Sequence, residues 1–193
     1  GLQDSYRRVE NVLTSIAARY RRHPCCAWVG TDGAGHFVKT MHNGIEYADM
    51  QMISEIYGIM RDGLRMKPVE MARTFQDWNA GKLNSYLIEV TAKVLGTIDK
   101  KTGKPIVDVI VDKAGQKGTG KWSVIEAQDL GTPATTLEAA VAARVLSSMK
   151  DDRTRMEAIY GISRKRISPR SRSAYLRQLE SALYAGKIAA YAQ

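Results

Sequence analysis

One continuous helical pattern, from about Gly35 to about Arg65, constrains the fold of this chain more than any other feature. It is longer than an average globular helix. Its second half is apolar and leaves no polar face wide enough for a surface helix, as shown by Met50, Met52, Ile53, Ile56, Tyr57 and Ile59. The sequence therefore predicts a long helix that is largely buried.

Five polar side chains share one face of this predicted helix, namely Lys39, His42, Asn43, Glu46 and Tyr47. At ~100° per residue they fall within an arc of roughly 140°, and the apolar residues between them lie mostly off it. Such stripes usually mark a solvated surface. A largely buried helix, however, should not carry five polar groups without partners. Lys39 and Glu46 offer a possible base and acid, so the stripe is a candidate catalytic face.

The remaining patterns predict a mainly α-helical chain. Apolar residues recur at helical intervals in five further segments, which are residues 9–20, 68–79, 81–98, 137–149 and 176–188. Two short runs, residues 25–29 and 105–111, are predicted to be strands because they are apolar or rich in β-branched residues. No internal repeat or low-complexity tract interrupts this order.

The composition is that of a one-domain globular protein, with 193 residues, 44% apolar and 25% charged. No run approaches the ~18 apolar residues of a membrane helix, so we expect no membrane partner and a cytoplasmic location. The two cysteines, Cys25 and Cys26, are adjacent and are expected to be buried as small apolar residues. Their spacing does not suit zinc, and with His23 and His36 standing apart no metal site is expected.

The net charge of +9 favours an anionic partner, and most of the excess lies in the last quarter of the chain. The basic stretch RKRISPRSRS, residues 164–173, could be an arm that binds nucleic acid. No aromatic platform is interleaved with these charges, and the spacing of zinc fingers or basic zippers is absent. A solvated or subunit-contacting loop is therefore the favoured interpretation, and no nucleic-acid partner is expected.

A glycine-rich loop, residues 115–122, nearly fits the P-loop pattern G-x-x-x-x-G-K-[ST]. Trp122 occupies the position where a hydroxyl must bind magnesium, which argues against a P-loop enzyme. Glycines that expose backbone N–H groups still suit phosphate, and Lys117 and Thr119 can bond phosphate oxygens without a metal. The other interpretation is an ordinary glycine turn.

Together these motifs resemble the 6-phosphogluconate dehydrogenase family. HFVKTMHNGIEY, residues 36–47, is similar to the catalytic helix of the family, and IVDKAGQKGTGKW, residues 110–122, is similar to its signature. Both are long and occur in the order and spacing of the family. Weaker similarity covers nearly the whole chain.

The resemblance implies oxidative decarboxylation of 6-phosphogluconate to ribulose 5-phosphate, with reduction of NADP, in the pentose phosphate pathway. Lys39 would be the general base at the C3 hydroxyl and would return a proton to that oxygen as carbon dioxide leaves. Glu46 would protonate C1. The implied substrate-binding residues are His42 and Asn43 for the sugar acid and Tyr47, Lys117, Thr119 and Arg144 for the phosphate. A base lysine must be neutral, which requires a desolvated or cation-crowded site.

The nucleotide-binding fingerprint G-x-G-x-x-G follows no predicted strand, so NADP would be bound mainly by an N-terminal domain outside these residues. By resemblance, residues 1–31 are the last helix and strand of a Rossmann-like coenzyme domain. Residues 32–193 would be the first half of the all-α catalytic and dimerisation domain of a homodimer. This chain is then expected to be inactive alone. The alternatives are a non-catalytic fragment or scaffold and, less favoured, a basic nucleic-acid-binding protein.

Overall fold

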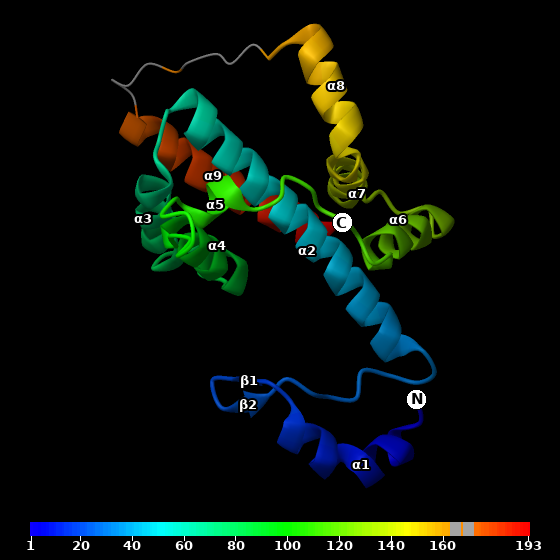
Figure 1. Ribbon diagram of the computed structural model, residues 1–193. Coiled ribbons are helices and arrows are strands. Elements are labelled where there is room, and N and C mark those ends of the chain that lie inside the picture. The colour runs from blue at the N-terminus through cyan, green and yellow to red at the C-terminus, as the bar shows by residue number, and fades with distance from the viewer. Residues whose placement is uncertain (163–166, 168–171) are drawn as a thin grey trace.

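The computed structural model describes residues 1–162, 167 and 172–193, and it is mainly α-helical (Figure 1). Most of the basic stretch 164–173 lies outside these described residues. The α-helices are α1 Gln3–Ile16, α2 Ala34–Gly58, α3 Pro68–Asn79, α4 Tyr86–Gly96, α5 Ile106–Val109, α6 Thr119–Asp129, α7 Thr135–Ser148, α8 Lys150–Tyr160 and α9 Arg172–Ala192. Strands β1, Arg19–Tyr20, and β2, His23–Pro24, form one antiparallel pair.

Helix α2 is the axis of the molecule and continues into a π-helical turn, η1, Ile59–Gly63. Helices α6, α7 and α9 contact it directly, and α9 lies alongside it, while α3 and α4 pack on each other near its far end (Figure 1). The predicted long helix and the mainly α fold class are therefore confirmed.

Two apolar clusters bury opposite halves of α2. The larger one joins the end of α2 and η1 to α3, α4 and α9, and its fully buried members include Met60, Phe75, Leu83, Ile88 and Leu183. Phe75 and Trp78 meet edge to face there, with ring centroids 5.2 Å apart. The smaller cluster joins the first half of α2 to α6, α7 and α9 through Ala48, Ala127, Ala134, Leu137, Ala140 and Ala190. Small alanine side chains allow these helices to approach α2 closely.

Local signals explain where α3 and α4 begin. Pro68 occupies the first position of α3, where its missing N–H costs no hydrogen bond. Ser85 caps α4 by accepting a hydrogen bond from the Ile88 N–H. The helix predicted over residues 81–98 is therefore shorter in the structure, since the residues before Ser85 form a turn.

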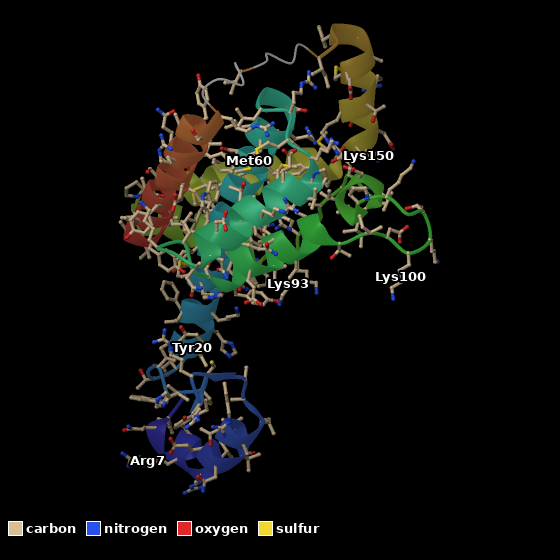
Figure 2. All side chains as sticks on the ribbon, turned by 90° about the vertical axis from the view of Figure 1, so that its left-hand side faces the viewer. Arg7, Tyr20, Met60, Lys93, Lys100 and Lys150 are labelled. Atoms are coloured by element: carbon tan, nitrogen blue, oxygen red, sulfur yellow. The ribbon has the colours of Figure 1, made fainter. Side chains whose placement is uncertain are left out.

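The N-terminal segment lies apart from the helical body, as the positions of Arg7 and Tyr20 show in Figure 2. Helix α1 has no buried residue, and Tyr20, predicted to extend it, pairs in β1 instead. The strand predicted at residues 25–29 is wrong, because no strand of the described residues pairs with it. The predicted burial of the cysteines is also wrong, since Cys25 is exposed and Cys26 only half-buried.

The strand predicted at residues 105–111 is wrong as well. Residues 106–109 form the short helix α5, because Ile98 supplies only an isolated bridge to Pro105 and the following backbone groups bond locally. Helices α6 and α8 were not predicted, because α6 has no clear apolar stripe and α8 is mostly polar. Among the described residues, no helix is long and apolar enough to cross a membrane.

Candidate active site

The polar face of α2 forms one connected row of side chains. The Lys39 Nζ lies 3.1 Å from the Nδ1 of His42, and the same ring nitrogen lies 3.5 Å from a carboxylate oxygen of Glu46. The side-chain oxygen of Asn43 lies 3.4 Å from that nitrogen. The offsets of three and four residues place these groups on adjacent turns of the helix. Lys39 and His42 are exposed, while Asn43 and Glu46 are partly buried, so the face is open to a ligand.

Tyr47 and Arg144 meet one turn further along α2. The guanidinium of Arg144, on α7, lies 4.3 Å from the centroid of the Tyr47 ring. It also donates a hydrogen bond of 2.8 Å to the Gly115 carbonyl and contacts the sulfur of Met50. Arg144 therefore ties the start of the glycine loop to α2, and the two phosphate-binding candidates Tyr47 and Arg144 form one cluster.

The glycine loop turns directly into α6. Gly118 has a φ of +103°, a left-handed conformation that glycine adopts without strain, and Thr119 is the first residue of α6. The first N–H groups of a helix have no intrahelical acceptor and attract anions. Lys117 is exposed on the same loop. This arrangement suits a phosphate group without a metal ion.

Close packing fixes α6 and α7 against the candidate catalytic face of α2. The buried hydroxyl of Ser123 donates to the Thr40 carbonyl at 2.6 Å and also contacts the Thr119 carbonyl. A Cβ on Gly44 would lie 2.7 Å from the Ser123 side chain, and one on Gly120 would lie 2.5 Å from the Tyr47 ring. These small residues position the site and were missed from the sequence. Their only signal was the small size of the side chains inside the two motifs.

A cavity of about 500 Å³ adjoins the Tyr47–Arg144 cluster. Its lining also includes Asp112, whose carboxylate pairs with Arg153, and Ser147. Arg153 additionally bonds the backbone carbonyls of Asp112 and Ser147, which holds the segment before the glycine loop against α7. The cavity thus extends the candidate phosphate site between α2 and α7.

The structure brings the predicted residues into two neighbouring groups, one on α2 and one between α2, α7 and the glycine loop. One group contains Lys39, His42, Asn43 and Glu46, and the other contains Tyr47, Arg144 and the loop that carries Lys117 and Thr119. Among the described residues, the Lys39 ammonium and the Glu46 carboxylate form no direct ion pair, and the Lys117 ammonium contacts no carboxylate.

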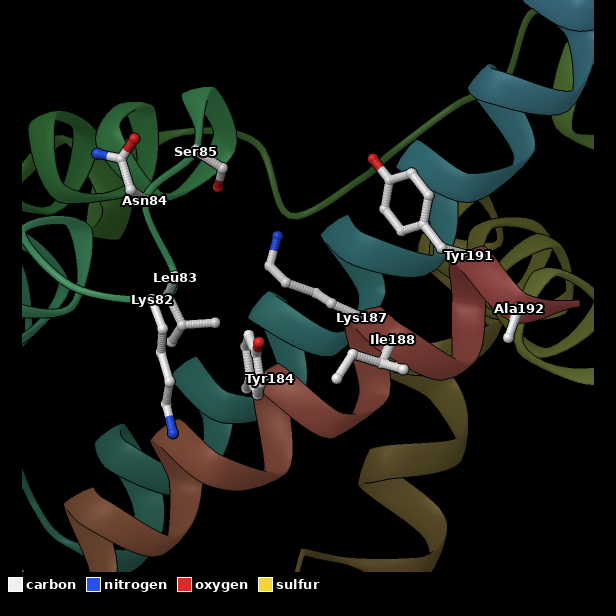
Figure 3. A pocket seen from close by; sticks show the side chains of 9 residues that line it. All are labelled: Lys82, Leu83, Asn84, Ser85, Tyr184, Lys187, Ile188, Tyr191 and Ala192. Atoms are coloured by element: carbon white, nitrogen blue, oxygen red, sulfur yellow. The ribbon is translucent and has the colours of Figure 1, made fainter.

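A groove of about 440 Å³ lies elsewhere, between α9 and residues 82–85, and contains none of the predicted site residues (Figure 3). The Lys82 ammonium lies over the Tyr184 ring there. Lys187 reaches from α9 to the buried carboxylate of Asp49 on α2. Within the part of the chain described, no three metal-ligating side chains cluster.

The fold and the site define a mainly α-helical domain that presents a lysine, a histidine and a glutamate near a glycine-rich loop. The sequence model of the 6-phosphogluconate dehydrogenase C-terminal domain matches residues 35–193. The chain therefore belongs to the 6-phosphogluconate dehydrogenase family.

Relatives agree along the whole chain. The decarboxylating 6-phosphogluconate dehydrogenase of Bacillus licheniformis is 47% identical over 193 residues, which are 100% of this chain and 41% of that protein. NAD(+)-dependent and NADP(+)-dependent decarboxylating relatives of Bacillus subtilis are 46% and 42% identical, with the same coverage. The solved 6-phosphogluconate dehydrogenase of Plasmodium falciparum, described with NADP+ and with 6-phosphogluconate, superposes with a TM-score of 0.91 at 41% identity over 99% of this chain and 41% of its own. The chain thus spans about two fifths of these relatives.

Proposed function

We propose that these residues form the catalytic helix and phosphate loop of a decarboxylating 6-phosphogluconate dehydrogenase. One observation carries the proposal. The row from Lys39 through His42 to Glu46 lies on an open helix face, next to the cluster of Tyr47, Arg144 and the glycine loop. A substrate with a reacting sugar acid at one end and a phosphate at the other matches this arrangement.

The proposed roles follow the chemistry of each side chain. Lys39 takes the proton of the C3 hydroxyl and returns it to the same oxygen as carbon dioxide leaves. Glu46 then protonates C1, which converts the enediol into ribulose 5-phosphate. Asn43 and His42 orient the sugar acid. Tyr47, Arg144, Lys117 and Thr119 bind the phosphate through charge-assisted hydrogen bonds.

The proposed hydride acceptor is NADP, which would act as the oxidant when bound. In the described part of the chain, the segment between β2 and α2 contains glycines but not the G-x-G-x-x-G pattern that would hold the pyrophosphate of a dinucleotide. The described residues therefore do not fit the coenzyme by themselves, and we assign none of them to its binding. In this proposal residues 1–31 belong to the coenzyme domain, and residues 32–193 to the all-α domain of a homodimer.

A reconstructed enzyme tests the proposal, with residues 1–193 replacing the matching segment of the Bacillus licheniformis relative. We expect it to reduce the coenzyme with 6-phosphogluconate as substrate. Lys39→Ala should lower kcat by about 10² to 10⁴, the usual contribution of a positioned base, and should change KM much less. Steady-state kinetics measures both effects.

Glu46→Gln separates the two chemical stages. Oxidation should persist while release of the five-carbon product slows, which product analysis after a single turnover detects. Lys104→Ala, on an exposed turn remote from the site, is the matched lysine control. Near-normal kcat in Lys39→Ala would assign the base to another residue, and a reconstructed enzyme without any coenzyme reduction would refute the proposal.

A further inference from the structure

The proposed reaction leaves the two catalytic groups in the wrong protonation states for another turnover. As the enediol becomes a ketone, Glu46 gives a proton to carbon and the enediol oxygen loses one to Lys39. Overall the reaction neither releases nor consumes a proton, because the proton lost by the C3 hydroxyl equals the one gained at C1. Each turnover thus ends with Lys39 as an ammonium and Glu46 as a carboxylate. Before the next turnover Lys39 must lose a proton and Glu46 must gain one.

Among the described residues, the Lys39 ammonium and the Glu46 carboxylate make no direct contact through which a proton could pass. They are seven residues apart on α2, which is ~10 Å along the helix axis at 1.5 Å per residue. Among the described residues they form no ion pair, yet both contact His42. The spacing of three residues on one side and four on the other is the one that places three side chains in a row on a helix.

We propose that His42 is the proton relay that resets Lys39 and Glu46 between turnovers, an inference that rests on the proposed function above. The proton leaves the Lys39 Nζ and bonds to the His42 Nδ1, which makes the ring an imidazolium. The Nδ1–H bond then breaks as the proton passes to the Glu46 carboxylate. The ring is neutral again, Lys39 is a free amine and Glu46 is a carboxylic acid. No electron or other reactant is needed.

One ring nitrogen performs both transfers. Lys39 lies 3.1 Å and Glu46 3.5 Å from the same Nδ1 atom, so the relay needs neither a ring flip nor a change of tautomer. The nitrogen accepts from an ammonium only when it carries no proton, and donates to a carboxylate only when it carries one. Imidazole as a class titrates between carboxylic acids and amines, which makes it the usual side chain for proton shuttling.

Kinetics of the reconstructed enzyme separates a relay from a binding role. His42→Gln keeps a hydrogen-bonding side chain but cannot carry a proton. The first turnover, measured by rapid mixing as coenzyme reduction at saturating substrate, should slow less than the steady-state rate, because loss of the orienting contact affects both rates and loss of the relay affects only the second. The steady-state rate at saturating substrate should fall about tenfold or more, as expected for loss of a proton-transfer group. Added imidazole should restore the steady-state rate and leave the first turnover unchanged.

His36→Gln is the matched control, since His36 is an exposed histidine on the same helix outside the row. The His36→Gln variant should change neither the rate of the first turnover nor the steady-state rate. If His42→Gln slows both phases equally, changes only KM, or resists imidazole, the relay is overturned. Failure of the proposed function is distinct, because then the unmodified reconstructed enzyme itself reduces no coenzyme.

A second test uses the 193-residue chain alone and needs no activity. Nitrogen-15 NMR of the histidine rings reports which nitrogen of His42 carries the proton. Lys39→Met should raise the Nδ1–H population, because the remaining partners of Nδ1, the Glu46 carboxylate and the Asn43 side-chain oxygen, both accept a hydrogen bond. Glu46→Gln should lower it, because the charged acceptor is lost. The His36 signal should be constant in both variants. An unchanged His42 tautomer in both variants would show that Nδ1 does not bridge the two groups, and the relay would be refuted.

Discussion

A single residue, Arg144, both orders the glycine loop and lies at the candidate phosphate site. Its guanidinium lies on the Tyr47 ring and holds the Gly115 carbonyl, so it orders the glycine loop while remaining beside the candidate phosphate site. The planar guanidinium group has five N–H donors and can donate to a carbonyl and to a phosphate at the same time, which the ammonium of a lysine cannot do in the same geometry. Substitution of Arg144, compared on substrates with and without a phosphate, should therefore distinguish its contribution to phosphate binding from its contribution to loop order.

We expect Arg144→Ala in the reconstructed enzyme to raise KM for 6-phosphogluconate by about 10- to 150-fold. That range corresponds to loss of a charged hydrogen bond of about 1.5–3 kcal/mol. Gluconate, which lacks the phosphate, should be affected little. Arg144→Lys should give an intermediate KM, because it retains the charge but loses the planar guanidinium group. Equal losses on both substrates would instead indicate that Arg144 serves only to order the loop.

The sequence predicted the residues on α2 better than those that position them. Lys39, His42 and Glu46 lie on one helix, so the helical period alone was enough to predict that they share a face. The exposure of Lys39 and His42 was not expected, because the apolar second half of α2 predicted a largely buried helix. The hydrogen bond from Ser123 to Thr40 joins distant segments, which no local pattern encodes.

At the scale of elements, the crossing of α2 with α6 and α7 depends on Gly44. We expect Gly44→Ala to destabilise the chain by about 1–3 kcal/mol, because its Cβ would overlap Ser123 and the side chain of Leu137. The midpoint temperature of thermal unfolding should then fall by about 2–4 °C for each kcal/mol of destabilisation. Gly58→Ala is the matched control on the same helix, where a Cβ meets no atom within 4 Å. It should stabilise by about 0.5–1 kcal/mol, so shifts of the same sign in both variants would contradict the packing argument.

The start of α3 gives a dependence of stability on pH. The carboxylate of Glu70 accepts the Lys67 backbone N–H at 2.7 Å and pairs with Arg172, and these contacts lower the pKa of that carboxyl despite partial burial. A lowered folded-state pKa contributes stability above the ordinary carboxyl pKa of about 4.3, and this stability is lost as the pH falls through the lowered value.

We therefore expect Glu70→Gln to lose about 0.5–1 kcal/mol at pH 7, the worth of a negative charge at a helix start. The difference from the unmodified chain should vanish below the lowered pKa of Glu70. Thermal unfolding at pH 7 and in strong acid measures it, with the exposed Glu157→Gln as control. A difference of the same size in acid would exclude the carboxylate as its source.

Helices were predicted more reliably than strands for a physical reason. A helix satisfies its backbone within one segment, so the apolar periods of α2, α3, α7 and α9 were sufficient. A strand needs a neighbour, and residues 25–29 and 105–111 have no partner strand within the described part of the chain. The β-branched composition of 105–111 therefore could not decide its structure. Helix α6 was not predicted because its apolar residues do not form one stripe, and α8 was not predicted because it contains few apolar residues.

At the scale of the whole molecule, the N-terminal segment and the helical body should differ in stability. Helix α1 buries no residue, and its apolar Val12 and Ile16 are 62% and 77% exposed, whereas α2 carries residues of both core clusters. We expect the amides of α1 to exchange with deuterium at least on the order of 10² faster than those of residues 44–56, because local opening costs little where few apolar contacts form. Mass spectrometry of peptides, obtained by digesting the chain after deuterium labelling, measures the exchange of each segment. Equal protection of α1 and residues 44–56 would contradict the prediction.

The hydrogen bond from Ser123 to Thr40 and the contact from Arg144 to Met50 span 83 and 94 residues of sequence. The row of Lys39, His42 and Glu46 on α2 can form as soon as its own helix does, but the Tyr47–Arg144 cluster can form only after α7 has been synthesised. During synthesis at about 5–20 residues per second, that interval lasts roughly 5–20 s. The growing chain thus exposes the proposed base Lys39 and the proposed acid Glu46 well before it possesses the complete candidate site, and the order of the segments in the gene sets the order in which that site forms.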